Sequence, residues 1–320
     1  MIQDEGTEVL GCAALQLRAG PWAGPEEWRR HCAALVEEAA ERGARVVAMP
    51  ALTGLLWGPG FLEDAASLAS SHRVYLAAGT VAEPRDGGWA HVAPVFGPSG
   101  ELLGSQAQLH LTPRDRGAGW VPGAGASVFR AGPATLGILV QADVWFPEVA
   151  RALCLLGADL LLALCAVPAP YSPWLQVAGS WQEAQQNQVF LTEACLVGEA
   201  AQGMPGGSAP PGALPGVPPG PPVAAAARAG TGLPAFPEGR LEGRSAIVGP
   251  CEITPGETGF LAQARDPGAP EAVVCALDFA ALDGIWLRYP IFNQLNHRLY
   301  EGRLPAAYAR VGGEPSGFPA

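Results

Sequence analysis

The sequence predicts an α/β layered fold with a largely parallel sheet. Short apolar segments typical of buried strands alternate with longer segments of helical periodicity along most of the chain. Apolar residues make up 49% of the 320 residues, which is typical of a globular chain with a sizeable core. The length fits one large α/β domain or two small ones.

In the first half of the chain, apolar runs and the breakers beside them define the elements. Gly43 ends the first helix and Pro50 ends the second strand, and a loop of ten residues follows. The composition of residues 97–100, Gly-Pro-Ser-Gly, predicts a turn between two paired strands. The expected strands are 9–17, 45–49, 74–80, 91–96 and 101–111, and the expected helices are 25–41 and 61–71.

The second half of the chain continues this alternation, with one interruption. Residues 200–240 shift to Pro, Gly and Ala, which predicts a surface insertion: a solvated loop, or a polyproline-type recognition segment. The expected strands are 128–130, 136–140, 160–164, 189–195, 245–248 and 272–277, and the expected helices are 147–156 and 181–187.

Charge limits the partners that the chain can take. The net charge is -11, and the longest basic cluster is Arg29-Arg30, so nucleic acid and anionic membranes are poor partners. All 19 basic residues are arginines, as a GC-rich coding bias would give. This chain therefore cannot use chemistry that needs a lysine ammonium.

The seven cysteines are an odd number without CxxC spacing, so they are expected to be reduced and mostly buried, with no metal site and no cofactor. The acidic N-terminal segment lacks an apolar run, which argues against a signal peptide and for a cytoplasmic location. The most apolar stretch, 152–170, contains Gly157 and Asp159, which fits a helix, turn and strand better than a membrane span.

A series of short motifs follows the same order along the chain. They are VVAMP at 46–50 with LTG at 52–54, QLHLTP at 108–113, Gly123 with Phe129, GILVQAD at 137–143, FPE at 146–148, GAD at 157–159, Asn187, and Gly243 with Ser245. In order and separation they resemble the carbon–nitrogen hydrolases of the nitrilase superfamily, over about residues 9–300. The resemblance implies an αββα sandwich, with one domain at 1–310, an insertion at 200–240 and a flexible tail at 311–320.

The family resemblance also implies homo-oligomers, dimers or higher, and a Glu-Lys-Cys triad. In this triad a thiolate attacks an amide or nitrile carbon, the Glu acts as general base and the Lys stabilises developing charge. The matching positions here hold Ala51, Gln108 and Gln141. A methyl and two neutral carboxamides cannot supply a base, a cation or a nucleophile. The sequence therefore predicts a pseudoenzyme that binds a small-molecule ligand or a partner such as an active paralogue.

Two alternatives remain open at the sequence level. One is a C–N hydrolase with a relocated nucleophile, for which Cys165 is the weak candidate; a buried structural thiol is the plainer reading. The other is a purely structural subunit, which would form oligomers without a ligand.

Five further residues are expected to line the remnant pocket. Four of them have a plainer structural reading as well: His91 as a satisfied surface histidine, His110 as a structural histidine, and Asp115 and Asp143 as residues that hold loops or helix starts. The five residues are His91, His110, Asp115, Asp143 and Trp145.

Overall fold

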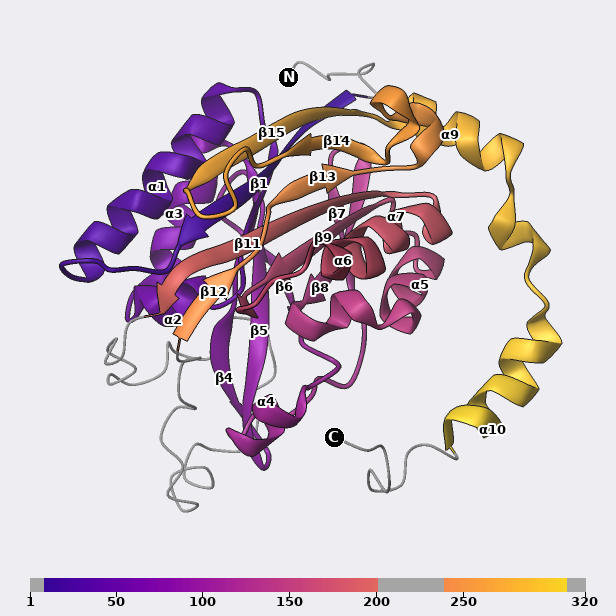
Figure 1. Cartoon of the computed structure of the whole chain (residues 1–320), viewed down its shortest axis with the longest axis horizontal. Helices are drawn as coiled ribbons and strands as arrows, with labels where there is room; N and C mark the ends of the chain where they lie inside the picture. The colour runs from indigo at the N-terminus through magenta and orange to yellow at the C-terminus, as the bar shows by residue number, and fades with distance from the viewer. Residues whose placement is uncertain (1–8, 201–238, 310–320) are drawn as a thin grey trace. The chain divides into compact units, whose positions relative to one another are not determined.

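The computed structural model describes residues 9–200 and 239–309. The chain divides into two compact units, Met1–Leu282 and Asp283–Ala320. The first unit holds all of the described strands (Figure 1). The motifs at residues 46–245 fall within it as well. The second unit includes the helix α10 (Leu304–Ala309). The expected tail at 311–320 lies outside the described residues, as does nearly all of the expected insertion.

The first layer of strands is built on parallel pairs. The strands β1, β2 and β3 pair in parallel, and β5 pairs antiparallel with β3, β4 and β6. The strand β15 pairs antiparallel with β1 along its length. The bounds are β1 (Val9–Arg18), β2 (Val46–Met49), β3 (Tyr75–Ala78), β4 (Val81–Arg85), β5 (Gly88–Phe96), β6 (Leu102–Ala107) and β15 (Glu271–Asp278), with α1 (Pro25–Glu41), α2 (Thr53–Trp57) and α3 (Phe61–His72) between them.

The second layer repeats the parallel arrangement. The strands β8, β9 and β11 pair in parallel, and β7, β12, β13 and β14 add antiparallel pairs at the edges. The bounds are β7 (Val128–Ala131), β8 (Ala134–Val140), β9 (Leu160–Cys165), β11 (Phe190–Ala200), β12 (Gly239–Glu242), β13 (Ala246–Val248) and β14 (Phe260–Gln263), with α4 (Pro113–Gly117), α5 (Pro147–Leu155), α6 (Pro173–Gln176) and α7 (Gln182–Asn187).

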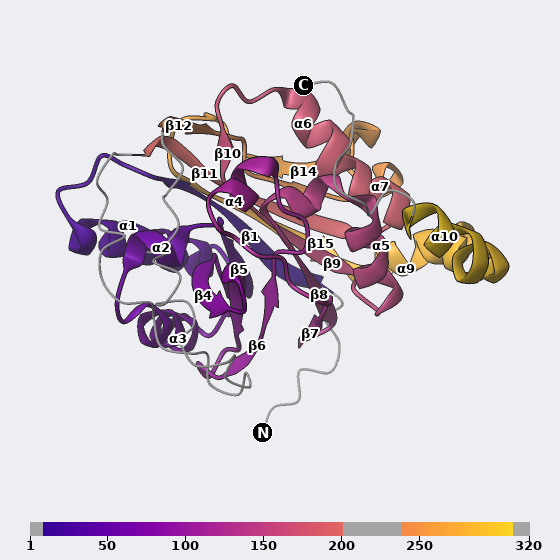
Figure 2. The ribbon, with the colours of Figure 1, turned by 90° about the horizontal axis from the view of Figure 1, so that it is seen from below.

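The core lies between these two layers. The strand β2 packs on β9 and β11, and β5 and β6 pack on β8. A Cβ at Gly104 would lie 2.8 Å from the ring of Phe129 in the opposite layer, so this glycine permits the close approach. Figure 2 shows α1 and α3 on one side of the strands and α5, α6 and α7 on the other. The predicted αββα sandwich is confirmed.

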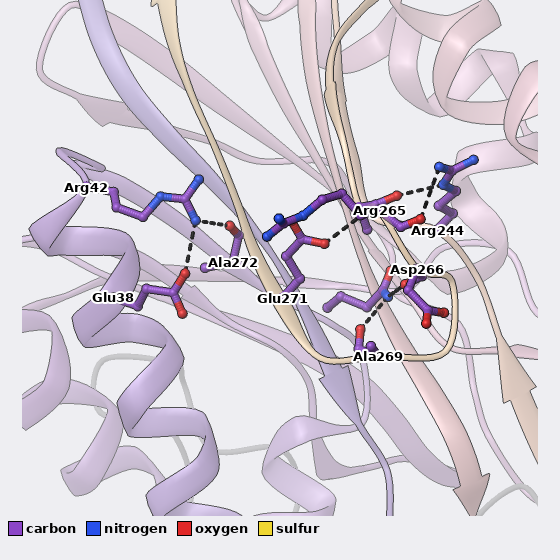
Figure 3. Close-up of polar contacts among 10 residues, drawn as sticks. Glu38, Arg42, Arg244, Arg265, Asp266, Ala269, Glu271 and Ala272 are labelled. Atoms are coloured by element: carbon purple, nitrogen blue, oxygen red, sulfur yellow. Dashed lines mark hydrogen bonds and ion pairs between the residues drawn. The ribbon is translucent and has the colours of Figure 1, made fainter.

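The long strand β15 is held to the layers by buried and half-buried polar groups. Arg42, near the end of α1, donates to the carbonyl of Ala272 at 2.7 Å, as Figure 3 shows. The fully buried Gln16 donates from Nε2 to the carbonyls of Asp266 and Ala269 at 2.6 and 2.7 Å. These bonds fix the turn that leads into β15.

Most of the expected elements are found, and the differences have physical causes. The expected loop at 51–60 contains the short helix α2, and the expected strand at 101–111 ends at Ala107. The strand β4 was not expected, because Pro84 and two charged residues break its apolar pattern; as an edge strand it tolerates a residue without an N–H.

The ends of the expected insertion are close in space. Ala200 at the end of β11 lies opposite Gly239 at the start of β12 in an antiparallel pair. Residues 201–238, which include the segment read as a loop or recognition segment, lie outside the described residues. Among the described helices, none combines the length and apolar character needed to cross a bilayer.

Candidate functional site

The three positions that match the triad each follow the end of a strand. Ala51 lies two residues after β2, Gln108 directly follows β6, and Gln141 directly follows β8. Because the two layers face each other, with β5 and β6 packed on β8, the ends of β6 and β8 belong to one region of the sandwich. The backbone therefore places the glutamines where residues from the two layers can meet.

Gln141 occupies a strained turn. Its φ of 53° is left-handed, which is uncommon for a residue with a side chain, and it opens the 3-10 turn Gln141–Trp145 directly after β8. Its side-chain Oε1 accepts a hydrogen bond from the backbone N–H of Ala166, which follows β9, at 3.0 Å. A strand-to-helix turn of this kind presents its side chain at the end of a sheet, as nucleophile turns do. Here it presents a carboxamide.

Gln108 is buried, and its amide has one fixed orientation. Its Nε2 donates to the carbonyl of His110 at 2.7 Å, and its backbone N–H donates to the carbonyl of His91 at 2.9 Å. The other amide atom, Oε1, is buried without a hydrogen-bond partner among the described residues. An unpaired acceptor in a protein interior is costly.

Asp143 joins the two glutamine segments. Its carboxylate is fully buried and accepts hydrogen bonds from the backbone N–H of Leu109 at 3.0 Å and of His110 at 2.7 Å. The His110 ring lies 3.3 Å away through Nδ1. Because Asp143 lies two residues after Gln141, it holds residues 108–110 against the turn at 141–145. It is a positioning residue of the site.

Ala51 is anchored differently. Its side chain is fully buried, and the next residue, Leu52, donates its N–H to Oγ1 of Thr80 at 2.8 Å. Leu52 itself has a left-handed φ of 68°. The carboxylate of Asp143 thus ties Gln108 and Gln141 together, whereas Ala51 is fixed to the connection between β3 and β4.

His91 lies beside Gln108 and is stacked on an aromatic ring. Its ring centroid is 3.3 Å from that of Trp120, with 18° between the planes. Burial lowers the pKa of His91 to about 3, so the imidazole is neutral at physiological pH. Trp120 also packs with Trp89 and Leu111 in one apolar cluster. Trp120 could not be singled out from the sequence, because the stack joins residues that are distant in the chain.

The other expected pocket residues have structural partners. His110 is stacked on Phe146, with 3.9 Å between ring centroids. Asp115 forms a capping box with Thr112 at the start of α4, which matches its structural reading. Trp145 donates its indole N–H to the carbonyl of Leu175 at 3.0 Å, just before the end of α6.

Cys165 is a poor nucleophile in this structure. Only 1% of the residue is exposed, and it lies opposite Cys195 in the parallel pair of β9 and β11. Burial, and then the nearby Glu193, raise the pKa of the Cys165 thiol well above its usual range. The buried Glu193, whose own pKa is raised by burial, was not singled out from the sequence. A thiol in this setting stays protonated.

A comparison with known protein families identifies relatives of this chain. The model of the carbon–nitrogen hydrolase family matches residues 12–251, more than half of the chain. A nitrilase from Pyrococcus abyssi is 29% identical over 182 residues, covering 52% of this chain and 67% of the relative. An omega-amidase from Danio rerio is 28% identical over 185 residues, covering 50% and 65%. The chain thus matches about two thirds of the length of these relatives.

Solved structures share the fold at low sequence identity. A carbon–nitrogen hydrolase from Helicobacter pylori G27 superimposes with a TM-score of 0.68 at 19% identity, covering 93% of this chain and 98% of that one. A form of the amidase from Nesterenkonia sp. AN1, which carries the acetamide moiety of fluoroacetamide at its active-site cysteine, gives 0.65 at 19% identity, covering 95% and 100%. With its fold and its matched sequence, the chain belongs to the carbon–nitrogen hydrolase family of the nitrilase superfamily.

Proposed function

We propose that this protein is a pseudoenzyme of the nitrilase superfamily, which binds a ligand or a partner and does not cleave C–N bonds by the thiol mechanism. The observation that carries the proposal is the strained turn after β8, where Gln141 presents a carboxamide. The turn is present without a nucleophile. A carboxamide nitrogen has its lone pair delocalised into the carbonyl and cannot take the part of a thiolate.

The two other matched positions support the same conclusion. Gln108 carries no charge, and its Nε2 is already bound to the carbonyl of His110, so it does not replace an ammonium that stabilises a developing oxyanion. Ala51 offers only a methyl group. Removing members of such a set typically costs orders of magnitude in rate, and the effects are far from additive.

The competing hypothesis is a hydrolase with a relocated nucleophile. It draws on the relatives, some of which are named as nitrilase or omega-amidase. The burial and raised pKa of Cys165 speak against this residue as the nucleophile. We therefore favour binding without turnover.

Restoring the triad should create activity that the natural chain lacks. We expect no ammonia release from a panel of small amides and nitriles with the natural chain, and measurable release with the variant Ala51→Glu, Gln108→Lys, Gln141→Cys. The expected gain is roughly a thousandfold or more over the natural chain, because three interacting groups return together. A coupled ammonia assay measures both proteins.

The single variant Gln141→Cys keeps the test informative if the triple variant misfolds, because it leaves the buried Ala51 and Gln108 unchanged. Its thiol should be alkylated faster than any buried cysteine of the natural chain. Turnover by the natural chain that disappears in Cys165→Ala would overturn the proposal.

A partner is a second part of the proposal. Four large apolar side chains are exposed around α5 and α6: Phe146, Leu155, Leu156 and Trp174, the last 76% exposed. Exposed apolar residues of this size on neighbouring elements are typical of association surfaces. We propose that this surface pairs with a second copy or with an active paralogue, which the oligomeric state in solution and co-purification from the native cell would test.

A further inference from the structure

We propose that residues 283–309 form an arm that docks on the acidic first unit of a second copy of this chain. The arm is the described part of the second unit. It shares no residue with the surface around α5 and α6. The inference therefore goes beyond the proposed function, and it does not depend on the loss of the triad.

The arm is rich in large apolar residues that the single chain leaves uncovered. Ten of the 23 residues from Trp286 to Tyr308 are Leu, Ile, Phe, Tyr or Trp. In the described part of residues 286–309, no side chain is buried. Leu287 is 86% exposed and Leu299 is 43% exposed. Ordering a segment of this kind costs conformational entropy, which only burial against another surface can offset.

The helical part of the arm gathers apolar residues on one side. The π turn η6 (Leu299–Arg303) leads directly into α10. Residues five apart lie close together across a π turn, and residues four apart do so on an α-helix. Leu299, Tyr300 and Leu304 therefore form an apolar stripe, whereas Glu301 lies on the other side. A stripe of this kind is the contact face of an amphipathic helix.

Charge indicates which kind of surface fits the arm. Residues 283–320 carry four arginines and three acidic residues, which gives a net charge of +1. Residues 1–282 carry 15 arginines and 27 acidic residues, which gives -12. Among the described residues, Arg288, Arg298 and Arg303 form no ion pair. An apolar stripe accompanied by such arginines complements an acidic protein surface.

A second copy of the chain is the partner that these observations favour. Its first unit supplies the excess of acidic side chains, and an interface of ordinary size takes about 20–30 residues from each partner, which the arm provides. Two arms that dock reciprocally would close a symmetric dimer. Arm-on-arm pairing would instead bring the arginines of both copies together. An anionic membrane would repel the first unit.

Sedimentation velocity over a wide range of concentrations tests the arm in the full natural chain. The natural chain should dimerise, and the variant Leu287→Gln, Leu299→Gln, Tyr300→Gln should raise the dissociation constant at least tenfold, because three apolar contacts are lost. Glutamine keeps the helix propensity high. The matched control is Leu103→Gln, an exposed leucine of β6, which should change nothing. A natural chain that stays monomeric, or a triple variant that associates equally well, would overturn the proposal.

Charge reversal tests the acidic partner surface independently of the apolar stripe. The variant Arg288→Glu, Arg298→Glu, Arg303→Glu should weaken dimerisation at least tenfold at low ionic strength, and added salt should weaken the natural dimer. All three arginines are exposed, so their replacement is compatible with folding. A dimer that responds neither to the reversal nor to salt would contradict docking on an acidic surface.

A benzophenone photo-cross-linker in place of Tyr300 identifies what the arm touches. The chain that carries it is labelled with ¹⁵N and mixed with an excess of unlabelled natural chain. Mass spectrometry should find the arm joined to unlabelled peptides from residues 9–282. Products that contain labelled peptides alone would show that the arm docks on its own chain, and products that join two arms would show arm-on-arm pairing. Either result would overturn the proposal.

The variant Trp174→Ser separates this arm from the surface around α5 and α6. If Trp174→Ser dissociates the dimer and the triple arm variant does not, the arm is refuted and the partner surface of the proposed function stands. The reverse result supports the arm and counts against that surface as the site of self-association. Neither result bears on the triad, which the ammonia assay tests.

Discussion

Replacing Asp143 with alanine is expected to lower the free energy of unfolding by about 3–5 kcal/mol. The carboxylate is fully buried and accepts the N–H groups of Leu109 and His110, and both would be left without an acceptor. These bonds also hold residues 108–110 against the turn that begins at Gln141. Urea unfolding of the variant and the natural chain measures the loss as a shift of the midpoint at constant slope.

A matched substitution separates hydrogen bonding from packing. Asp143→Asn keeps the shape and one acceptor oxygen, so it should cost clearly less than Asp143→Ala. A loss below about 1 kcal/mol in the alanine variant would show that Asp143 does not brace the site, since bonds to a buried charged acceptor are typically stronger than that.

Lowering the pH should destabilise the protein through His91 by an amount on the order of 4 kcal/mol at the acid end. In the folded state burial lowers the pKa of His91 to about 3, whereas the model value is 6.5. Between pH 6.5 and pH 3, His91 is therefore mostly protonated in the unfolded chain and mostly neutral in the folded chain. The stabilisation is complete above pH 6.5 and is lost progressively as the pH falls toward 3.

The variant His91→Phe isolates this contribution. As the pH falls from 6.5 to 4, the stability of the variant relative to the natural chain should rise steadily. The stability difference measured at pH 8 reports only the packing change. Urea unfolding at a series of pH values measures both. A difference that is constant with pH would mean that the imidazole is accessible to protons in the folded state.

Much of the fold follows from local sequence patterns. The parallel strands at the centre are mostly apolar runs, and helix α1 begins and ends at the predicted residues, with Pro25 at its first position and Gly43 just beyond its end. Elements and their ends were missed where contacts with distant parts of the chain determine them. The strand expected at 101–111 ends at Ala107: the N–H of Gln108 still donates to His91 in β5, but those of Leu109 and His110 donate to Asp143 from another part of the chain.

The site was only partly predictable, for the same reason. The motif order predicted that Ala51, Gln108 and Gln141 correspond to the triad, and the structure places each of them just after a strand. The sequence could not show that Gln108 keeps one amide atom free, because that depends on where the carbonyl of His110 lies. Nor could it show the stack of His91 on Trp120, or that Cys165 lies beside Glu193 in a setting that keeps its thiol protonated.

The proposed absence of a reacting nucleophile is tested most directly by intact-protein mass spectrometry after exposure to fluoroacetamide, the reagent whose acetamide moiety was found on the active-site cysteine of the Nesterenkonia amidase. The natural chain should keep its mass, while the variant with the three restored residues should gain one acetamide group at position 141. An adduct that forms in the native protein and maps to Cys165 would contradict the account, because it would place a working thiolate where the structure has a buried, protonated thiol.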